Sequence, residues 1–178
     1  MIAYFGYGTN RDHDMMAAMV GRGNLEGVKG TLSGYELVIQ DLEDITNQVS
    51  PIAPVPRSPR EIMATALGDS AKLYIIRPSP SAVTYGTIWQ ISEDEYEMVR
   101  DWELLDFGMQ EDIKVQVRTE SGSPVEAQTH GSNDAMLSAG EVVVDENYEN
   151  YLVPREVILE TAKRVHQEFL DRQTQVNS

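Results

Sequence analysis

The sequence predicts an α+β domain in which a strongly curved or barrel-like sheet carries helices on its outer surface. Two observations lead to this class. Most segments alternate apolar and polar residues with the period of a strand, and turns of hairpin length join them. Only a few segments show the apolar period of a helix. The 178 residues, 41% of them apolar, suffice for one core, so we assign 1–178 to a single domain.

The N-terminal part predicts a strand, a turn and a short helix in that order. Residues 2–6 have strand character, and the stretch YFGYGTN then ends in the turn residues 7–10. A short helix carries Met15, Met16, Ala18 and Met19 and is stopped by the glycines at 21 and 23. The following VKGTLSGYELVIQD alternates around a central Gly and predicts one or two strands.

Residues 42–70 predict a Pro-rich insertion that leaves the sheet. Four prolines lie between Ser50 and Arg60, so this segment should be partly extended, with one helical turn near Ile62–Leu67. The next stretch, KLYIIRPSPSAVTYGTIWQI, has two strand-like halves around a Pro/Ser turn. We expect these halves to pair with each other as a hairpin.

The C-terminal part adds a helix, two strands and a final helix. Ser92 followed by Glu95 is the capping-box pattern of a helix start. The stretches EDIKVQVRTE and VEAQTHG alternate as strands on either side of the turn SGSP. The final helix follows Pro154 and has an apolar stripe of Ile158, Ala162, Val165 and Phe169.

Composition excludes several classes of function. The formal charge of −15 argues against nucleic acid or an anionic membrane as a partner, because binding phosphates requires an excess of Lys and Arg on one face. The sequence has no Cys, which excludes disulfides, thiolate zinc sites and a Cys nucleophile. There is no signal-peptide pattern and no run of about 18 apolar residues. We therefore expect a cytoplasmic protein.

The sequence gives no positive sign of a metal or a cofactor. His13, His130 and His166 lack the close spacing of metal ligands, and we expect them to be surface or half-buried residues. The acidic stretch DWELLDFGMQED lacks the alternation of a calcium loop. Dinucleotide, phosphate-loop, nucleophile-elbow and zinc-protease motifs are missing from the sequence. We expect no metal and no cofactor.

Glu103 is the carboxylate that stands out. On the helix that begins after Ser92, it falls on the same arc as Tyr96, Val99 and Trp102, which is the apolar face. One interpretation is that the helix has already frayed at this position and the carboxylate reaches solvent. The other is that Glu103 points into a cavity, because burying an unpaired carboxylate is costly. A carboxyl group placed in a cavity suits a general base and acid.

Four motifs in order resemble the γ-glutamylcyclotransferase-like superfamily, which includes γ-glutamylamine cyclotransferases and AIG2-like proteins. YFGYGTN is similar to its YFAYGSN signature, and LSGYELVI to its second strand. RPSPSAVTYGTIWQIS resembles its SPG-x-x-V-x-G-V-V-W hairpin, and DWELLDFGM resembles the segment around its catalytic glutamate. The resemblance implies a small closed mixed β-barrel with flanking helices. It also implies that Glu103 is catalytic and that the substrate-binding residues are Tyr7, Gly8, Thr9 and Asn10.

The resemblance further implies an intramolecular reaction without a cofactor. The α-amine of a γ-glutamyl amino acid, peptide or amine attacks its own γ-carbonyl, closes 5-oxoproline and expels an amine. Glu103 would take a proton from the α-ammonium and give one to the departing nitrogen. Backbone N–H groups near Gly8, with the Thr9 and Asn10 side chains, would hold the substrate's anionic groups.

The sequence departs from the family pattern near these residues. Leu104 stands where a Gly usually follows the glutamate, and Thr9 replaces a Ser. The tyrosine that often opens the final helix has no clear counterpart, although Tyr148 or Tyr151 could take its place. Two alternatives therefore stay open: a binding protein that keeps the pocket without the reaction, and an acidic interaction protein that uses the Pro-rich segment 50–60. The sequence allows an oligomer without specifying one.

Overall fold

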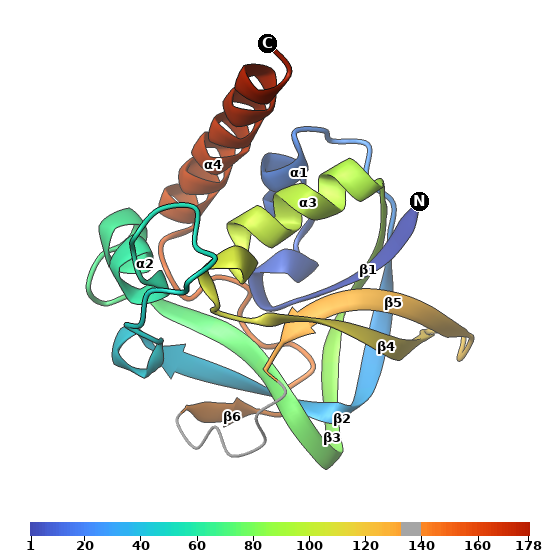
Figure 1. Cartoon of the computed structure of the whole chain (residues 1–178). Coiled ribbons are helices and arrows are strands. Elements are labelled where there is room, and N and C mark those ends of the chain that lie inside the picture. The colour runs from blue at the N-terminus through green and yellow to red at the C-terminus, as the bar shows by residue number, and fades with distance from the viewer. Residues whose placement is uncertain (133–139) are drawn as a thin grey trace.

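The computed structural model describes residues 1–132 and 140–178, and they form a closed barrel with helices around it (Figure 1). The strands are β1 (Ile2–Tyr7), β2 (Gly27–Asp41), β3 (Lys72–Ile91), β4 (Glu111–Thr119), β5 (Pro124–Gly131) and β6 (Glu141–Val143). The α-helices are α1 (His13–Val20), α2 (Pro59–Leu67), α3 (Glu93–Trp102) and α4 (Arg155–Val176). Short 3-10 turns are η1 (Gly8–Arg11), η2 (Leu42–Asp44) and η3 (Leu105–Phe107).

The barrel closes because the two end strands of its five-stranded order, β3 and β2, also pair with each other. The order is β3-β1-β5-β4-β2, and β2 pairs back to β3. β1 and β5 are parallel, and the other barrel pairs are antiparallel. β6 extends the sheet beside the second half of β2. The fold is therefore a closed mixed five-stranded β-barrel with four helices in the described chain.

The expected hairpin within KLYIIRPSPSAVTYGTIWQI is wrong. This stretch forms one strand, β3, and both of its halves pair with β2 instead of with each other. The register shifts where Ser33 pairs with Val83 and Tyr35 with Pro78, so the residues between Pro78 and Val83 bulge. Gly34 lies opposite this bulge with φ +88°, a conformation that favours glycine. β2 and β3 bend together there (Figure 1).

Two apolar clusters hold the fold, and the alternation of β1 contributes to both. Phe5 and Tyr7 belong to the cluster that includes the inward side chains of β4, such as Val115. Tyr4 belongs to the second cluster, in which α1, α3 and α4 pack on the barrel. The methionines of α1 lie there together with Val99 of α3 and Ile158 of α4.

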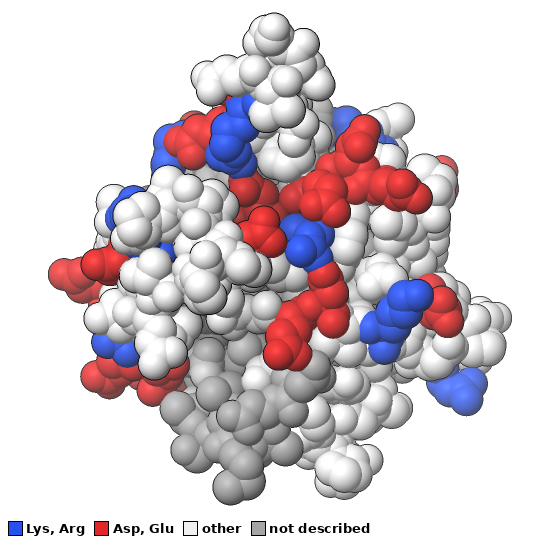
Figure 2. Space-filling model, viewed as in Figure 1, with Lys and Arg blue, Asp and Glu red and all other residues white. Residues whose placement is uncertain are grey.

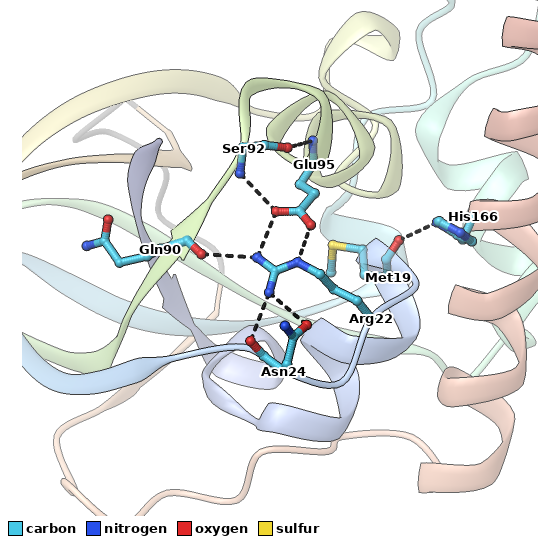
Figure 3. A network of polar contacts seen from close by, with 7 residues as sticks. All are labelled: Met19, Arg22, Asn24, Gln90, Ser92, Glu95 and His166. Atoms are coloured by element: carbon cyan, nitrogen blue, oxygen red, sulfur yellow. Dashed lines mark hydrogen bonds and ion pairs between the residues drawn. The ribbon is translucent and has the colours of Figure 1, made fainter.

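The start of α3 is fixed as the capping box predicts. Ser92 Oγ accepts a hydrogen bond from the Glu95 N–H at 3.1 Å, and Glu95 Oε2 accepts one from the Ser92 N–H at 2.8 Å. Arg22 also donates to both carboxylate oxygens of Glu95 and to the carbonyls of Asn24 and Gln90 (Figure 3). This arginine ties the chain after α1 to the first turn of α3.

The predicted insertion 42–70 corresponds to the connection between β2 and β3. Its helix α2 is longer than the single turn expected at Ile62–Leu67, because Ser58 and Glu61 form a second capping box and Pro59 begins the helix. α2 packs near α4. Figure 1 shows α2 beside the first half of α4, both to the left of the C-terminal end of α3.

Acidic side chains dominate the visible face that carries α3. Figure 2 shows Asp and Glu gathered there, with Lys and Arg placed singly among them. Arg100 of α3 is paired with Glu97, Asp106 and Asp112. Within residues 1–132 and 140–178, no helix combines the length and apolar character needed to cross a membrane.

Candidate active site

Glu103 lies one residue beyond α3, where the helix ends without fraying into solvent. Its N–H donates to the Val99 carbonyl at 2.9 Å. Leu104 then has φ 55° and ψ 37°, the left-handed conformation that commonly ends a helix. Gly adopts this backbone conformation freely, whereas a residue with a Cβ such as Leu104 adopts it at a cost. The Glu103 side chain is 12% exposed, so it points inward.

Three side chains surround the Glu103 carboxylate. Asn10 Nδ2 donates to Oε1 at 2.6 Å, and Gln110 Nε2 donates to Oε2 at 2.8 Å. His130 Nε2 lies 3.3 Å from Oε2. The carboxylate therefore points inward as expected, but the premise that it is unpaired is wrong, because charge-assisted hydrogen bonds offset its burial.

His130 completes a closed ring of contacts. Asn10 Nδ2 donates to the Tyr4 hydroxyl at 2.9 Å, and that hydroxyl lies 3.3 Å from His130 Nδ1. Burial lowers the pKa of His130, although Glu103 opposes this effect, and burial raises the pKa of Tyr4 well above its usual value. A neutral imidazole that accepts the Tyr4 O–H at Nδ1 carries its own hydrogen on Nε2 and donates it to Glu103.

Tyr7 orients the second donor. Its hydroxyl has one hydrogen, which is shared between the His130 carbonyl at 2.8 Å and Gln110 Oε1 at 3.1 Å. With its amide oxygen engaged in this way, Gln110 presents its NH₂ group to Glu103. Burial raises the pKa of Tyr7 well above its usual value, and the charge of Glu103 adds to this, so the hydroxyl stays a donor.

Hydrogen bonds to segments distant in the sequence hold the predicted loop Tyr7–Asn10 in its conformation. The Gly8 N–H donates to the Tyr148 hydroxyl at 2.9 Å, and that hydroxyl donates to the Tyr85 carbonyl at 2.6 Å. Gly8 has φ +60°, and a Cβ there would lie 2.7 Å from the Tyr74 ring, so only Gly fits. The Thr9 hydroxyl donates to the Asn150 carbonyl at 2.9 Å.

A cavity of about 390 Å³ opens beside Glu103. Four of the five predicted site residues line it: Tyr7, Thr9, Asn10 and Glu103. Gly8 is outside this lining and supports the loop instead. Tyr148 and Tyr151 are also outside it; Tyr148 supports Gly8, and Tyr151 donates to Asp12 at 2.5 Å. The cavity lies within the usual size range of small-molecule sites.

Sequence reasoning missed His130, Gln110 and Tyr4. The expectation of a surface or half-buried residue is wrong for His130, which is 3% exposed, because β5 carries it beneath Glu103. In the sequence, His130 is one more polar residue at the end of a strand and gives no signal of this position. In the described ranges 1–132 and 140–178, no group of three His, Asp or Glu residues could hold a metal ion.

Comparison with known proteins gives matches at the level of structure. No protein-family model and no curated protein matches the sequence. A human protein described as uncharacterized protein loc79017 has 15% identity and a TM-score of 0.56, covering 99% of this chain and 86% of that one. A structure named γ-glutamyl cyclotransferase has 15% identity and a TM-score of 0.55 with the same coverage.

These matches establish the class of fold. Both extend over nearly the whole chain, and they agree with the closed five-stranded barrel described above. The chain therefore has the γ-glutamylcyclotransferase-like fold that the four sequence motifs predict. At 15% identity the likeness concerns the fold alone, since one fold hosts different functions.

Proposed function

We propose that this protein is a cyclotransferase that converts a γ-glutamyl amino acid, peptide or amine to 5-oxoproline and releases the amine. The observation that supports this most is the position of Glu103: a carboxylate surrounded by donors in the wall of a small-molecule cavity, beside the loop Tyr7–Asn10. The reaction requires a proton acceptor at such a position and no cofactor.

The proposed chemistry moves protons from the attacking nitrogen to the departing nitrogen through Glu103. The carboxylate takes a proton from the substrate's α-ammonium, and the freed amine attacks the γ-carbonyl carbon. A new C–N bond closes the five-membered ring, Glu103 gives its proton to the departing nitrogen, and the original amide C–N bond breaks. The ring nitrogen loses its second proton, which leaves with the released amine as an ammonium ion. Within the described residues, Oε2 faces both Gln110 and His130, whereas Oε1 accepts from Asn10. We therefore assign the proton transfer to Oε1.

The ring of side chains positions Glu103 for this role. Asn10 contacts both Glu103 and Tyr4, and His130 connects Tyr4 back to Glu103. A carboxylate held from two sides keeps its orientation while the substrate's flexible chain folds for attack. His130, Gln110 and Tyr4 are therefore positioning residues in this proposal.

We assign the substrate's developing oxyanion and its α-carboxylate to the loop Tyr7–Asn10. The Gly8 N–H already donates to Tyr148, so the N–H of Thr9, the next residue and part of the cavity lining, is the donor we propose for the oxyanion. The contacts of Gly8 and Thr9 with the segment before α4 keep this donor in place without reorganisation.

The test is turnover of a substrate panel. The protein is incubated with γ-glutamyl dipeptides, γ-glutamyl amines and glutathione, and 5-oxoproline is quantified by mass spectrometry. We expect 5-oxoproline from at least one member. If none is turned over while members still bind, the protein is a non-catalytic small-molecule binding protein of the same fold.

A further inference from the structure

The cavity beside Glu103 continues into an apolar region that the proposed chemistry does not use. One wall comes from α2, through Ile62, Met63 and Leu67, and another from α4, through Val165. Trp102, immediately before Glu103, adds an aromatic side chain. Most of these side chains are only half-buried, so their apolar surface is available to a ligand.

The polar and apolar regions are parts of one cavity. Asn10, Glu103 and His130 line it together with Ile62 and Val165. A γ-glutamyl substrate must place its ammonium group and its γ-carbonyl beside Glu103 for the proposed reaction. The substituent on the departing nitrogen is then the part that extends towards α2 and α4.

The charges around this region offer little to a charged substituent. Arg57 is exposed and already donates to the Thr65 hydroxyl and the Glu61 carbonyl. The remaining cations of the lining are exposed and paired with carboxylates: Lys72 with Asp41 at 3.0 Å, Arg164 with Glu168 at 3.0 Å, and Arg172 with Asp101 at 2.7 Å. A cation that is exposed to water and already paired with a carboxylate attracts a negatively charged substituent only weakly.

We propose that the leaving group is bulky and apolar: a large aliphatic or aromatic amino acid, or the corresponding amine. This inference rests on the proposed function and specifies its substrate class. The apolar walls bury such a substituent, whereas a small or charged one leaves them in contact with water. Because α2 belongs to the connection between β2 and β3, that insertion supplies one of the two walls on which this preference depends.

The first experiment compares leaving groups. We expect kcat/KM for γ-glutamyl-leucine and γ-glutamyl-phenylalanine to exceed that for γ-glutamyl-glycine and γ-glutamyl-glutamate by about tenfold or more. Equal or faster turnover of the glycine or glutamate compound would overturn the inference while leaving the proposed function intact.

A matched pair of variants on α4 locates the preference. Val165→Asn changes a residue of the cavity wall, and Val157→Asn changes the same residue type at a 43% exposed position outside the lining. We expect Val165→Asn to reduce the leucine-to-glycine ratio of kcat/KM about tenfold and Val157→Asn to leave it unchanged. Ile62→Asn tests the α2 wall in the same way if Val165→Asn does not fold. An unchanged ratio in folded wall variants contradicts the proposal.

Binding separates this inference from the proposed function. Calorimetry with the wild-type protein and the Glu103→Gln variant measures affinity for the same four compounds without requiring 5-oxoproline. Tighter binding of the leucine and phenylalanine compounds supports an apolar pocket even if turnover is never observed. Equal or weaker binding of these two compounds rejects the apolar pocket whatever the activity.

Discussion

At the scale of single residues, the central feature is the enclosure of Glu103. Asn10 and Gln110 donate to it, and His130 faces it from β5. Burial favours the uncharged forms of His130 and Tyr4. Tyr4 therefore keeps its hydroxyl hydrogen for His130 Nδ1, and the neutral imidazole keeps one on Nε2 for Glu103. These residues come from positions up to 126 apart in the sequence, which explains why the ring depends on the closed barrel.

His130→Gln tests whether this histidine positions the carboxylate. We expect kcat/KM to fall on the order of 10²-fold, because the reacting oxygen loses its fixed orientation. The fall should appear in kcat of the folded protein at saturating substrate, because the change alters how the reacting carboxylate is held. A merely structural role would lower the folded fraction and leave kcat of the folded protein unchanged.

The lowered pKa of His130 predicts that the stability of the fold depends on pH. The folded protein holds His130 below its usual pKa, while the unfolded chain takes up a proton near pH 6.5. Above that pH its contribution to stability is complete, and stability falls as the pH drops through 6.5 because the unfolded state binds the extra proton. Urea unfolding from pH 8 to pH 5 should show an added loss of stability, at most about 1.4 kcal/mol per pH unit, that disappears in His130→Gln. A variant with the wild-type slope would refute this.

At the scale of elements, α3 delivers Glu103 because both of its ends are fixed. The capping box of Ser92 and Glu95, reinforced by Arg22, holds the first turn, and the left-handed Leu104 ends the helix immediately after the carboxylate. The Arg22 hydrogen bonds are the main reason that the pKa of Glu95 is lowered, which keeps it charged as an acceptor.

Ser92→Ala should cost about 1 kcal/mol of unfolding free energy, the usual effect of losing an N-cap acceptor. We expect a smaller loss of activity to accompany it, because the far end of α3 carries Glu103. Ser70→Ala, at an exposed position outside the helices, is the control and should change stability by less than about 0.5 kcal/mol. Equal effects of the two substitutions in urea unfolding would argue against the role of the cap.

Local patterns predicted the elements that depend on local interactions. The box at Ser92 and the alternation of β4 describe contacts within a few residues, and both are confirmed. The hairpin in β3 was wrong because its partner, β2, lies across the insertion, and no local signal marks that pairing. Glu103 was predicted from helix geometry and the resemblance, whereas His130 needed the register of β5 in the closed barrel.

At the scale of the whole molecule, the barrel brings separate segments around one cavity. η1 and the end of α3 supply its polar part, and α2 and α4 supply its apolar walls. The charge of −15 and the acidic face in Figure 2 are consistent with our proposal of a small-molecule partner in place of a nucleic acid.

Amide hydrogen exchange can test whether α2 and α4 line one ligand-binding cavity. When γ-glutamyl-leucine binds the Glu103→Gln variant, we expect slower amide exchange in α2 and in residues 155–165 of α4, because the ligand holds these two walls together. The turn between β4 and β5, at 120–123, is distant in the topology and serves as the internal control. Protection confined to that turn, or absent from α2, would contradict a cavity shared by α2 and α4.

The most direct test of the central claim is the rate of 5-oxoproline formation by Glu103→Gln, measured on the substrate that the wild-type protein turns over best. Gln preserves the shape of the side chain and removes proton transfer, so we predict a loss of about 10³-fold or more in kcat with an unchanged circular dichroism spectrum. A folded Glu103→Gln protein that forms 5-oxoproline within tenfold of the wild-type rate would show that Glu103 is not the general base and acid.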